Sequence, residues 1–84
     1  MIKVGDLVQP RDSAVLGTPE EWGLTDRKEM VTKVRAFHGV GVVVSEPHID
    51  AALWTEPVVE ILWSGLGTTQ KQPLGTVEVI NASR

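Results

Sequence analysis

Short segments rich in β-branched residues, each bounded by proline or glycine, constrain the fold of this chain most strongly. Three are clear, at residues 3–9, 40–46 and 58–64, and a shorter one lies at 76–80. A weaker segment at 69–72 follows a glycine-containing turn, so it is expected to pair with 58–64 as a hairpin. Segments of this composition and with these boundaries are typical of strands. The sequence therefore predicts a mainly β fold of about five strands.

Alternation within these segments predicts which side chains form the core. Successive side chains of a strand point to opposite faces, so Val59, Ile61 and Trp63 share one face, and we assign that face to the core. Both faces of the segment 40–46 are apolar. This segment is expected to be a central strand, with another element or a partner covering its outer side.

The stretch between the first two predicted strands is long and irregular. Thr18 is placed as the N-cap of a short helical turn, with Pro19 at its first position, Glu21 completing a capping box and Gly23 ending it. Residues 25–37 fit two patterns, because Met30 and the apolar residues after it suit one helical face and also a strand. We favour a strand or extended arm. A helix here is the alternative, and it would give a two-layer arrangement of helix on sheet.

Size and composition limit the classes of function. The chain has 84 residues, enough for one domain, and no cysteine that could form a disulfide or a thiolate–metal site. The net charge of −3 argues against a dedicated nucleic-acid binder, and acidic neighbours dilute the cations of residues 27–35. No apolar run approaches the length that spans a membrane. We expect no membrane association and consider nucleic acid an unlikely partner.

Candidate catalytic and metal-binding groups do not form a recognisable constellation. His48 has carboxylates two residues to either side, but that spacing is not specific to metal ligands, and a solvated turn is the simpler interpretation. His38 is interpreted as a turn or packing residue. No serine lies in a nucleophile elbow, and Asp6 is expected to shape a turn. The sequence therefore predicts a protein that is not an enzyme and needs no cofactor or metal.

The tryptophans carry more information. Trp63 belongs to the predicted core, whereas Trp22 and Trp54 each suit either a lid on an open barrel end or an anchor in a protein interface. A partner interface is predicted at six apolar residues, namely Trp22, Leu24, Met30, Phe37, Leu53 and Trp54.

Four pieces of the chain together resemble a known family. Val-Gly-Asp-Leu-Val at 4–8 resembles the opening strand of small SH3-like barrels, and Gly-Val-Val-Val at 41–44 resembles their second strand. The run Val-Glu-Ile-Leu-Trp-Ser-Gly at 59–65 is similar to their "V-x-V-L-W-S-G" strand and turn. Leu74 with Val-Glu-Val-Ile at 77–80 is similar to the closing "L-E-V-I". This order recurs in short open reading frames of tailed bacteriophages.

The resemblance implies one SH3-like β-barrel domain over residues 1–84, with residues 10–39 as a long insertion loop or arm after the first strand. It implies a virion structural protein: a capsid cement or decoration protein, or a neck or tail component such as a head–tail connector. Its partners would be other virion proteins, contacted by many copies in a symmetric assembly. The protein would be made in the host cytoplasm and end in the virion. The alternative is an SH3-like module that binds nucleic acid or peptide.

Overall fold

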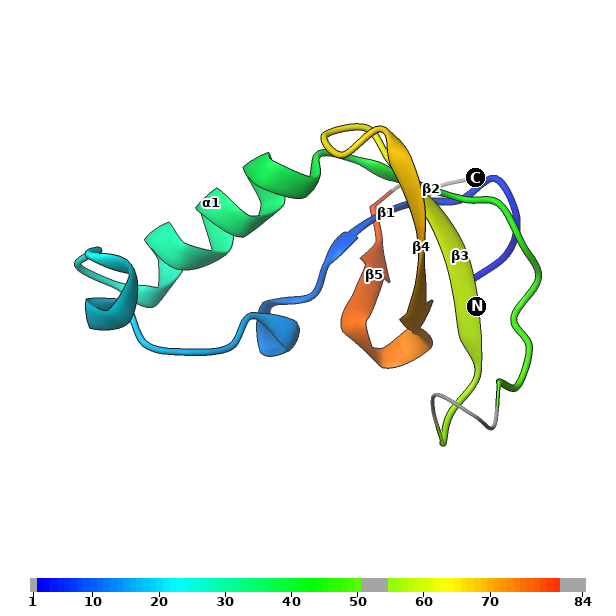
Figure 1. The fold of residues 1–84 in the computed structure, drawn as a ribbon, viewed down its shortest axis with the longest axis horizontal. Coiled ribbons are helices and arrows are strands. Elements are labelled where there is room, and N and C mark those ends of the chain that lie inside the picture. Colours follow the sequence, from blue (N-terminus) through cyan, green and yellow to red (C-terminus); the bar gives the residue numbers. More distant parts are fainter. Residues whose placement is uncertain (1, 51–54, 81–84) are drawn as a thin grey trace.

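The computed structural model describes residues 2–50 and 55–80. The strands within these ranges are β1 (Leu7–Pro10), β2 (Gly41–Val43), β3 (Val58–Trp63), β4 (Thr68–Pro73) and β5 (Val77–Val79) (Figure 1). The helices are the α-helix α1 (Arg27–His38) and three short 3₁₀ turns, η1 (Asp12–Ala14), η2 (Glu20–Trp22) and η3 (Leu74–Thr76). The expectation of a mainly β fold with about five strands is confirmed.

The strands form one antiparallel sheet in the order β4-β3-β2-β1-β5. The hairpin of β3 and β4 is the one expected from the sequence, and β2 lies in the centre, as its two apolar faces predict. The outermost strands β4 and β5 do not pair with each other in the part of the chain that the structure describes, so the sheet is open. The closed barrel expected from the sequence is therefore not confirmed.

The core lies on one face of the sheet. Its six buried members are each at most 1% exposed: Val8, Val43, Val59, Ile61, Trp63 and Val77. The inward face predicted for β3 is thus confirmed. The interior also needs a residue without a side chain at Gly41, where a Cβ would lie 2.5 Å from Ile61 Cγ2 and 2.8 Å from Trp63 Cε3. Gly41 therefore makes room for Trp63, the largest fully buried side chain among the described residues.

The region between β1 and β2 contains the helix α1. The interpretation of residues 25–37 as a strand or extended arm is therefore wrong. Asp26 is the N-cap of α1, and its carboxylate accepts a hydrogen bond from Glu29 N at 2.8 Å. Glu29 Oε1 in turn accepts from Thr25 N at 3.1 Å. This reciprocal capping satisfies backbone donors that have no partner inside the helix, and it outweighs the strand-like alternation of 25–37. Gly39, with φ of 72°, ends the helix.

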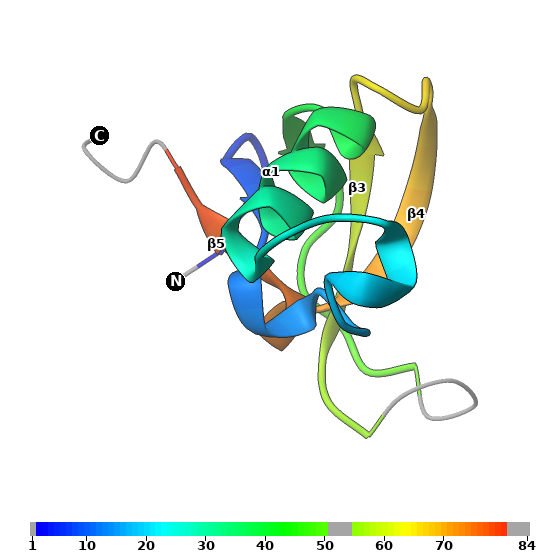
Figure 2. The same cartoon turned by 90° about the vertical axis from the view of Figure 1, so that its left-hand side faces the viewer.

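α1 lies beside the sheet rather than flat across it (Figures 1 and 2). Its buried residues Met30 and Val31 form a second small cluster with Val15, which follows η1. The short turn predicted at residues 18–23 is also present. Glu21 Oε1 accepts from Thr18 N at 2.8 Å, and Gly23, with φ of 72°, ends the turn. The segment 10–39 is therefore a folded helical layer beside the sheet, not a loop.

The close approach at Gly41 generates the first prediction. Gly41→Ala should destabilise the protein by roughly 1–3 kcal/mol, because the new methyl group overpacks the core. Gly75→Ala is the matched control, since a Cβ there meets only the flexible carboxylate of Glu56, at 3.3 Å. Urea unfolding of both variants measures the difference. Equal stability of the two variants would contradict the packing described.

The capping of α1 generates the second prediction. Asp26→Ala should lower the free energy of unfolding by about 1 kcal/mol, because the first turn loses the side-chain acceptor for Glu29 N. Lys33→Ala, on the exposed side of the same helix, is the control and should change stability little. Denaturant unfolding followed by circular dichroism measures both. A loss no larger than that of the Lys33 variant would show that the cap contributes nothing.

Candidate functional site

Four of the six residues predicted as a partner interface lie in the described ranges, and these four do not form one surface. Phe37 is 67% exposed in the last turn of α1, and Trp22 is 45% exposed in η2. η2 lies near the start of α1, at the opposite end from the last turn that carries Phe37 (Figure 1). Met30 is completely buried and Leu24 packs beside it, which leaves Met30 no surface for a partner. The two other predicted interface residues, Leu53 and Trp54, lie outside the described residues.

A cleft of about 230 Å³ lies between α1, η1 and the open side of the sheet. Sequence reasoning missed it, because its walls come from segments that are distant in the chain. Five of its lining residues are apolar: Pro10, Ala14, Val15, Val34 and Val77. The others are Trp63 and three polar residues, His38, Gln72 and Thr76. No charged side chain is among these residues, so the cleft suits an uncharged ligand group.

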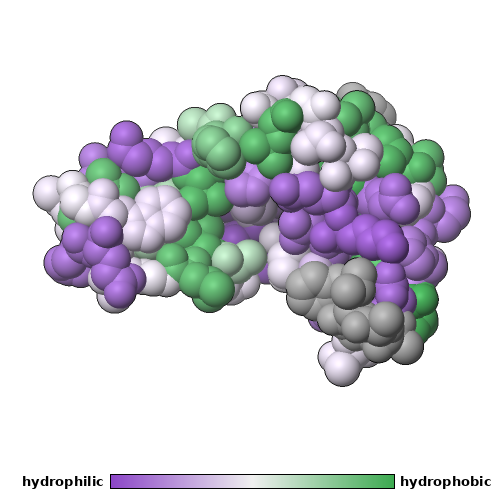
Figure 3. Space-filling model, in the orientation of Figure 1, coloured by the Kyte–Doolittle hydropathy of each residue, from purple (hydrophilic) through white to green (hydrophobic). Residues whose placement is uncertain are grey.

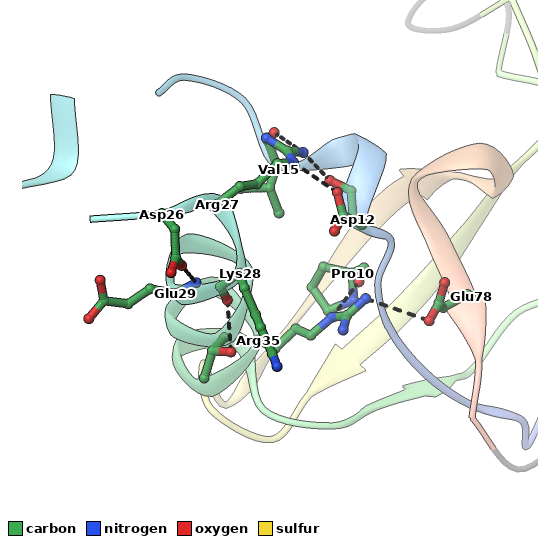
Figure 4. A network of polar contacts seen from close by, with 10 residues as sticks. Pro10, Asp12, Val15, Asp26, Arg27, Lys28, Glu29, Arg35 and Glu78 are labelled. Atoms are coloured by element: carbon green, nitrogen blue, oxygen red, sulfur yellow. Dashed lines mark hydrogen bonds and ion pairs between the residues drawn. The ribbon is translucent and has the colours of Figure 1, made fainter. Parts of the chain in front are cut away.

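Two arginines of α1 fix the helical wall of the cleft (Figure 4). At the start of the helix, Arg27 donates to Asp12 Oδ1 at 2.9 Å and to Val15 O at 2.9 Å. Near its end, Arg35 Nε donates to Pro10 O at 3.0 Å, and a second guanidinium nitrogen lies 3.5 Å from Glu78 Oε2. Exposed ion pairs contribute little, so the bonds to the two backbone carbonyls matter most. They attach the start of α1 to the residue after η1 and the last turns of α1 to β1.

Within the described residues, one buried side-chain polar atom has no hydrogen-bond partner. This atom belongs to Trp63. Its side chain is 1% exposed, and Nε1–H has no acceptor. Leaving such a donor unpaired costs about 1–3 kcal/mol. Cε3 and Cζ3 of the indole lie closest to Gly41 of β2, and Nε1 is on the opposite edge of the ring. Trp63 lines the cleft, and none of the lining residues comes from β2.

His38 lies against Trp63 and lines the same cleft. The two ring centroids are 5.0 Å apart in an edge-on arrangement. His38 Nδ1 is 3.1 Å from Val34 O. A carbonyl oxygen only accepts, so Nδ1 carries the proton and Nε2 of the neutral ring keeps a free lone pair. The sequence interpretation of His38 as a packing residue captures the contact with Trp63 but not this acceptor.

The outer face of the sheet carries an apolar strip. Val42 of β2 is paired across the strands with Leu7 of β1 and Leu62 of β3, and Val40 and Val44 flank it along the chain. Val40, Val44 and Leu62 are each 41–43% exposed. We call these five residues the outer strip. The strip is the face of β2 for which the sequence predicted a cover, and no described element buries it.

Hydrophilic residues lie over β4, with apolar ones on either side of them (Figure 3). The described residues hold no group of three histidine or acidic side chains placed to bind a metal ion. Nor does any helix in those ranges have the length and apolar character needed to cross a membrane.

Comparisons with models of known protein families, with curated proteins and with solved structures found no significant match to this chain.

One ion pair has a measurable pH signature. Lys71 Nζ donates to Asp50 Oδ2 at 3.0 Å. This hydrogen bond, then the charge of Asp50 and a smaller effect of Glu60, raise the pKa of Lys71 above its ordinary value of 10.5, against a small opposing effect of desolvation. Since the pKa is raised in the folded state, the ion pair stabilises the fold below pH 10.5 and this contribution is lost as the pH rises through the folded-state pKa.

We therefore predict that Asp50→Asn moves the pKa of Lys71 back towards 10.5. Asp12→Asn, which removes an ion pair elsewhere, should leave the Lys71 titration unchanged. The titration is followed by NMR at the lysine side-chain carbon next to Nζ. An unchanged Lys71 pKa in the Asp50 variant would mean that this pair does not persist in solution.

Proposed function

We propose that this protein is a non-catalytic structural component of a tailed-phage particle that acts through protein–protein contacts. The observation that carries the proposal is the outer strip, an apolar band on the central strands of the sheet that no described element buries. Contiguous exposed apolar surface on a small protein usually marks an interface. The lack of a charged or nucleophilic cluster in the cleft gives no support to an enzyme.

The proposal includes an SH3-like fold for the domain. β1 pairs with both β2 and β5, and η3 connects the two edge strands β4 and β5. This order agrees with the resemblance of the four sequence pieces to small SH3-like barrels. An SH3-like barrel would require the β4 and β5 edges to approach each other around the core.

The energetics of the outer strip fit an assembly of many copies. Burying a half-exposed valine or leucine contributes about 1 kcal/mol. The few side chains of the strip would thus give one modest contact per subunit after the costs of association. In a symmetric particle, a subunit that contacts several neighbours is retained by the sum of such contacts. A capsid cement or decoration protein, or a neck or tail subunit such as a head–tail connector, meets this condition.

A nucleic-acid role is the weaker candidate. Cations from the only concentrated group in the sequence are held by acidic partners, Arg27 by Asp12 and Arg35 by Glu78. Lys71 is likewise paired with Asp50. Phosphate binding needs several clustered cations that are free to contact the backbone, and the net charge of −3 opposes it.

The test is mass analysis of purified particles of the phage that encodes the chain. The protein should be present in many copies. In a variant that carries both Val42→Ser and Leu62→Ser, the copy number per particle should fall by more than about tenfold. Each substitution removes buried apolar surface and so weakens every contact that the subunit makes. Leu16→Ser is the matched control, since Leu16 is 78% exposed in a loop away from the strip. Particles without the protein, or equal incorporation of both variants, would refute the proposal.

A further inference from the structure

We propose that the free edge of β4 pairs with the same edge of a second copy of this chain, so that two five-stranded sheets join into one antiparallel sheet. The contact is isologous, with Gln70 of each copy at the two-fold axis. It uses the edge of the sheet, leaves the outer strip exposed and does not depend on the proposed virion role.

The first observation is the alternation of backbone hydrogen bonds along β3. Glu60 O accepts from Val44 N at 2.9 Å, and Val58 exchanges two backbone bonds with His48. Glu60 and Val58 thus direct their backbone groups towards β2 and the segment after it. In an antiparallel pair, neighbouring residues direct their N–H and C=O groups to opposite sides. The residues of β3 that bond to β4 are therefore Val59, Ile61 and Trp63.

The register then fixes which residues of β4 face the free edge. The partners of those three residues in β4 are Gln72, Gln70 and Thr68. Thr69 and Lys71 lie between them, so each directs one N–H and one C=O away from β3. β4 is an outermost strand of the sheet, at the right in Figure 2, and no described residue bonds these four groups. A row of unpaired backbone groups is a template for another strand.

The second observation is that the free groups match themselves under two-fold rotation. Thr69 and Lys71 lie one residue to either side of Gln70. An antiparallel copy centred on Gln70 therefore places the partner's Lys71 opposite Thr69, and the partner's Thr69 opposite Lys71. Each of these pairs exchanges two N–H···O bonds. All four free groups of each chain are then bonded, which identifies a second copy as the strand that fits this edge.

The ends of the edge favour the same register. Pro73 has no N–H, and its carbonyl oxygen accepts from Thr76 Oγ1 at 2.8 Å. At the other end, Gly67 N donates to Trp63 O at 2.8 Å. A register shifted by two residues in either direction would bring one of these ends against free groups of the second copy and lose bonds. The register centred on Gln70 is the one that pairs every available group.

The side chains near the axis are compatible with this pairing. Gln72 Nε2 donates to Gln70 Oε1 at 3.2 Å. A glutamine amide has donors as well as an acceptor, so the two Gln70 side chains can bond to each other across the axis. An edge lysine normally opposes strand pairing. Here Lys71 is held by Asp50 at 3.0 Å, so each copy carries its own counter-ion to the axis.

The test is concentration-dependent association of the full-length protein, followed by sedimentation equilibrium and by amide hydrogen exchange measured with NMR. A contact of four backbone bonds is small, so we expect a dissociation constant of about 0.1–1 mM. Exchange at the amides of Thr69 and Lys71 should be fast in dilute solution and slow several-fold as the dimer forms. The amides of Gln70 and Gln72 should be protected at every concentration, because they bond to β3.

Thr69→Pro removes one outward N–H from each copy and leaves the bonds to β3 in place, since proline is accepted on an edge strand where its nitrogen faces solvent. Two of the four bonds are lost, so the dissociation constant should rise by more than about tenfold. Lys71→Thr is the matched control, because it keeps both backbone groups and should still dimerise. Protection of the Gln70 and Gln72 amides verifies that the hairpin is intact in each variant.

Three results would overturn the proposal. The first is a protein that stays monomeric at about 1 mM. The second is a dimer in which the amides of Thr69 and Lys71 exchange as fast as in the monomer, since that dimer forms through another surface. The third is the same dissociation constant for Thr69→Pro and Lys71→Thr. Incorporation into particles tests the outer strip separately, so failure of one proposal is distinguishable from failure of the other.

Discussion

The contact of Trp63 with Gly41 is the constraint on which the rest of the structure depends. A glycine on the central strand leaves space for an indole that is completely buried, and any Cβ there would overlap it. With Trp63 fixed inward, the pleat also directs Ile61 inward and Leu62 outward. The same indole meets His38 at the end of α1, so one side chain links the sheet core to the helical layer.

The outer strip and the cleft both follow from this placement. On the outer side, the pleat leaves the apolar side chains of the outer strip partly exposed. On the inner side, the sheet stays open between β4 and β5, and the cleft lies there against α1. One small domain thus has a broad apolar face and a narrow, mostly apolar cleft.

The strands were predictable from the sequence because alternation and turn residues act locally. The observed β3 agrees with the predicted strand in its position and in its inward face. β1 begins later than predicted, because Lys3 N donates to Asp6 Oδ2 in a turn that precedes the strand. The helix was misassigned because its signal is the Asp26–Glu29 cap rather than an apolar period. The cleft could not be predicted, since it joins Pro10, Val34 and Val77 across three elements. Only the fold brings such residues together.

Solvent accessibility of the methyl groups tests the central claim most directly. A neutral paramagnetic chelate added to the isolated protein broadens the NMR signals of wetted methyl groups. The account predicts strong broadening at Val44 and Leu62 and almost none at Val43 and Ile61, although these residues alternate along the same two strands. Comparable broadening on both faces would contradict a dry interior built around Trp63 and would remove the basis for both surfaces.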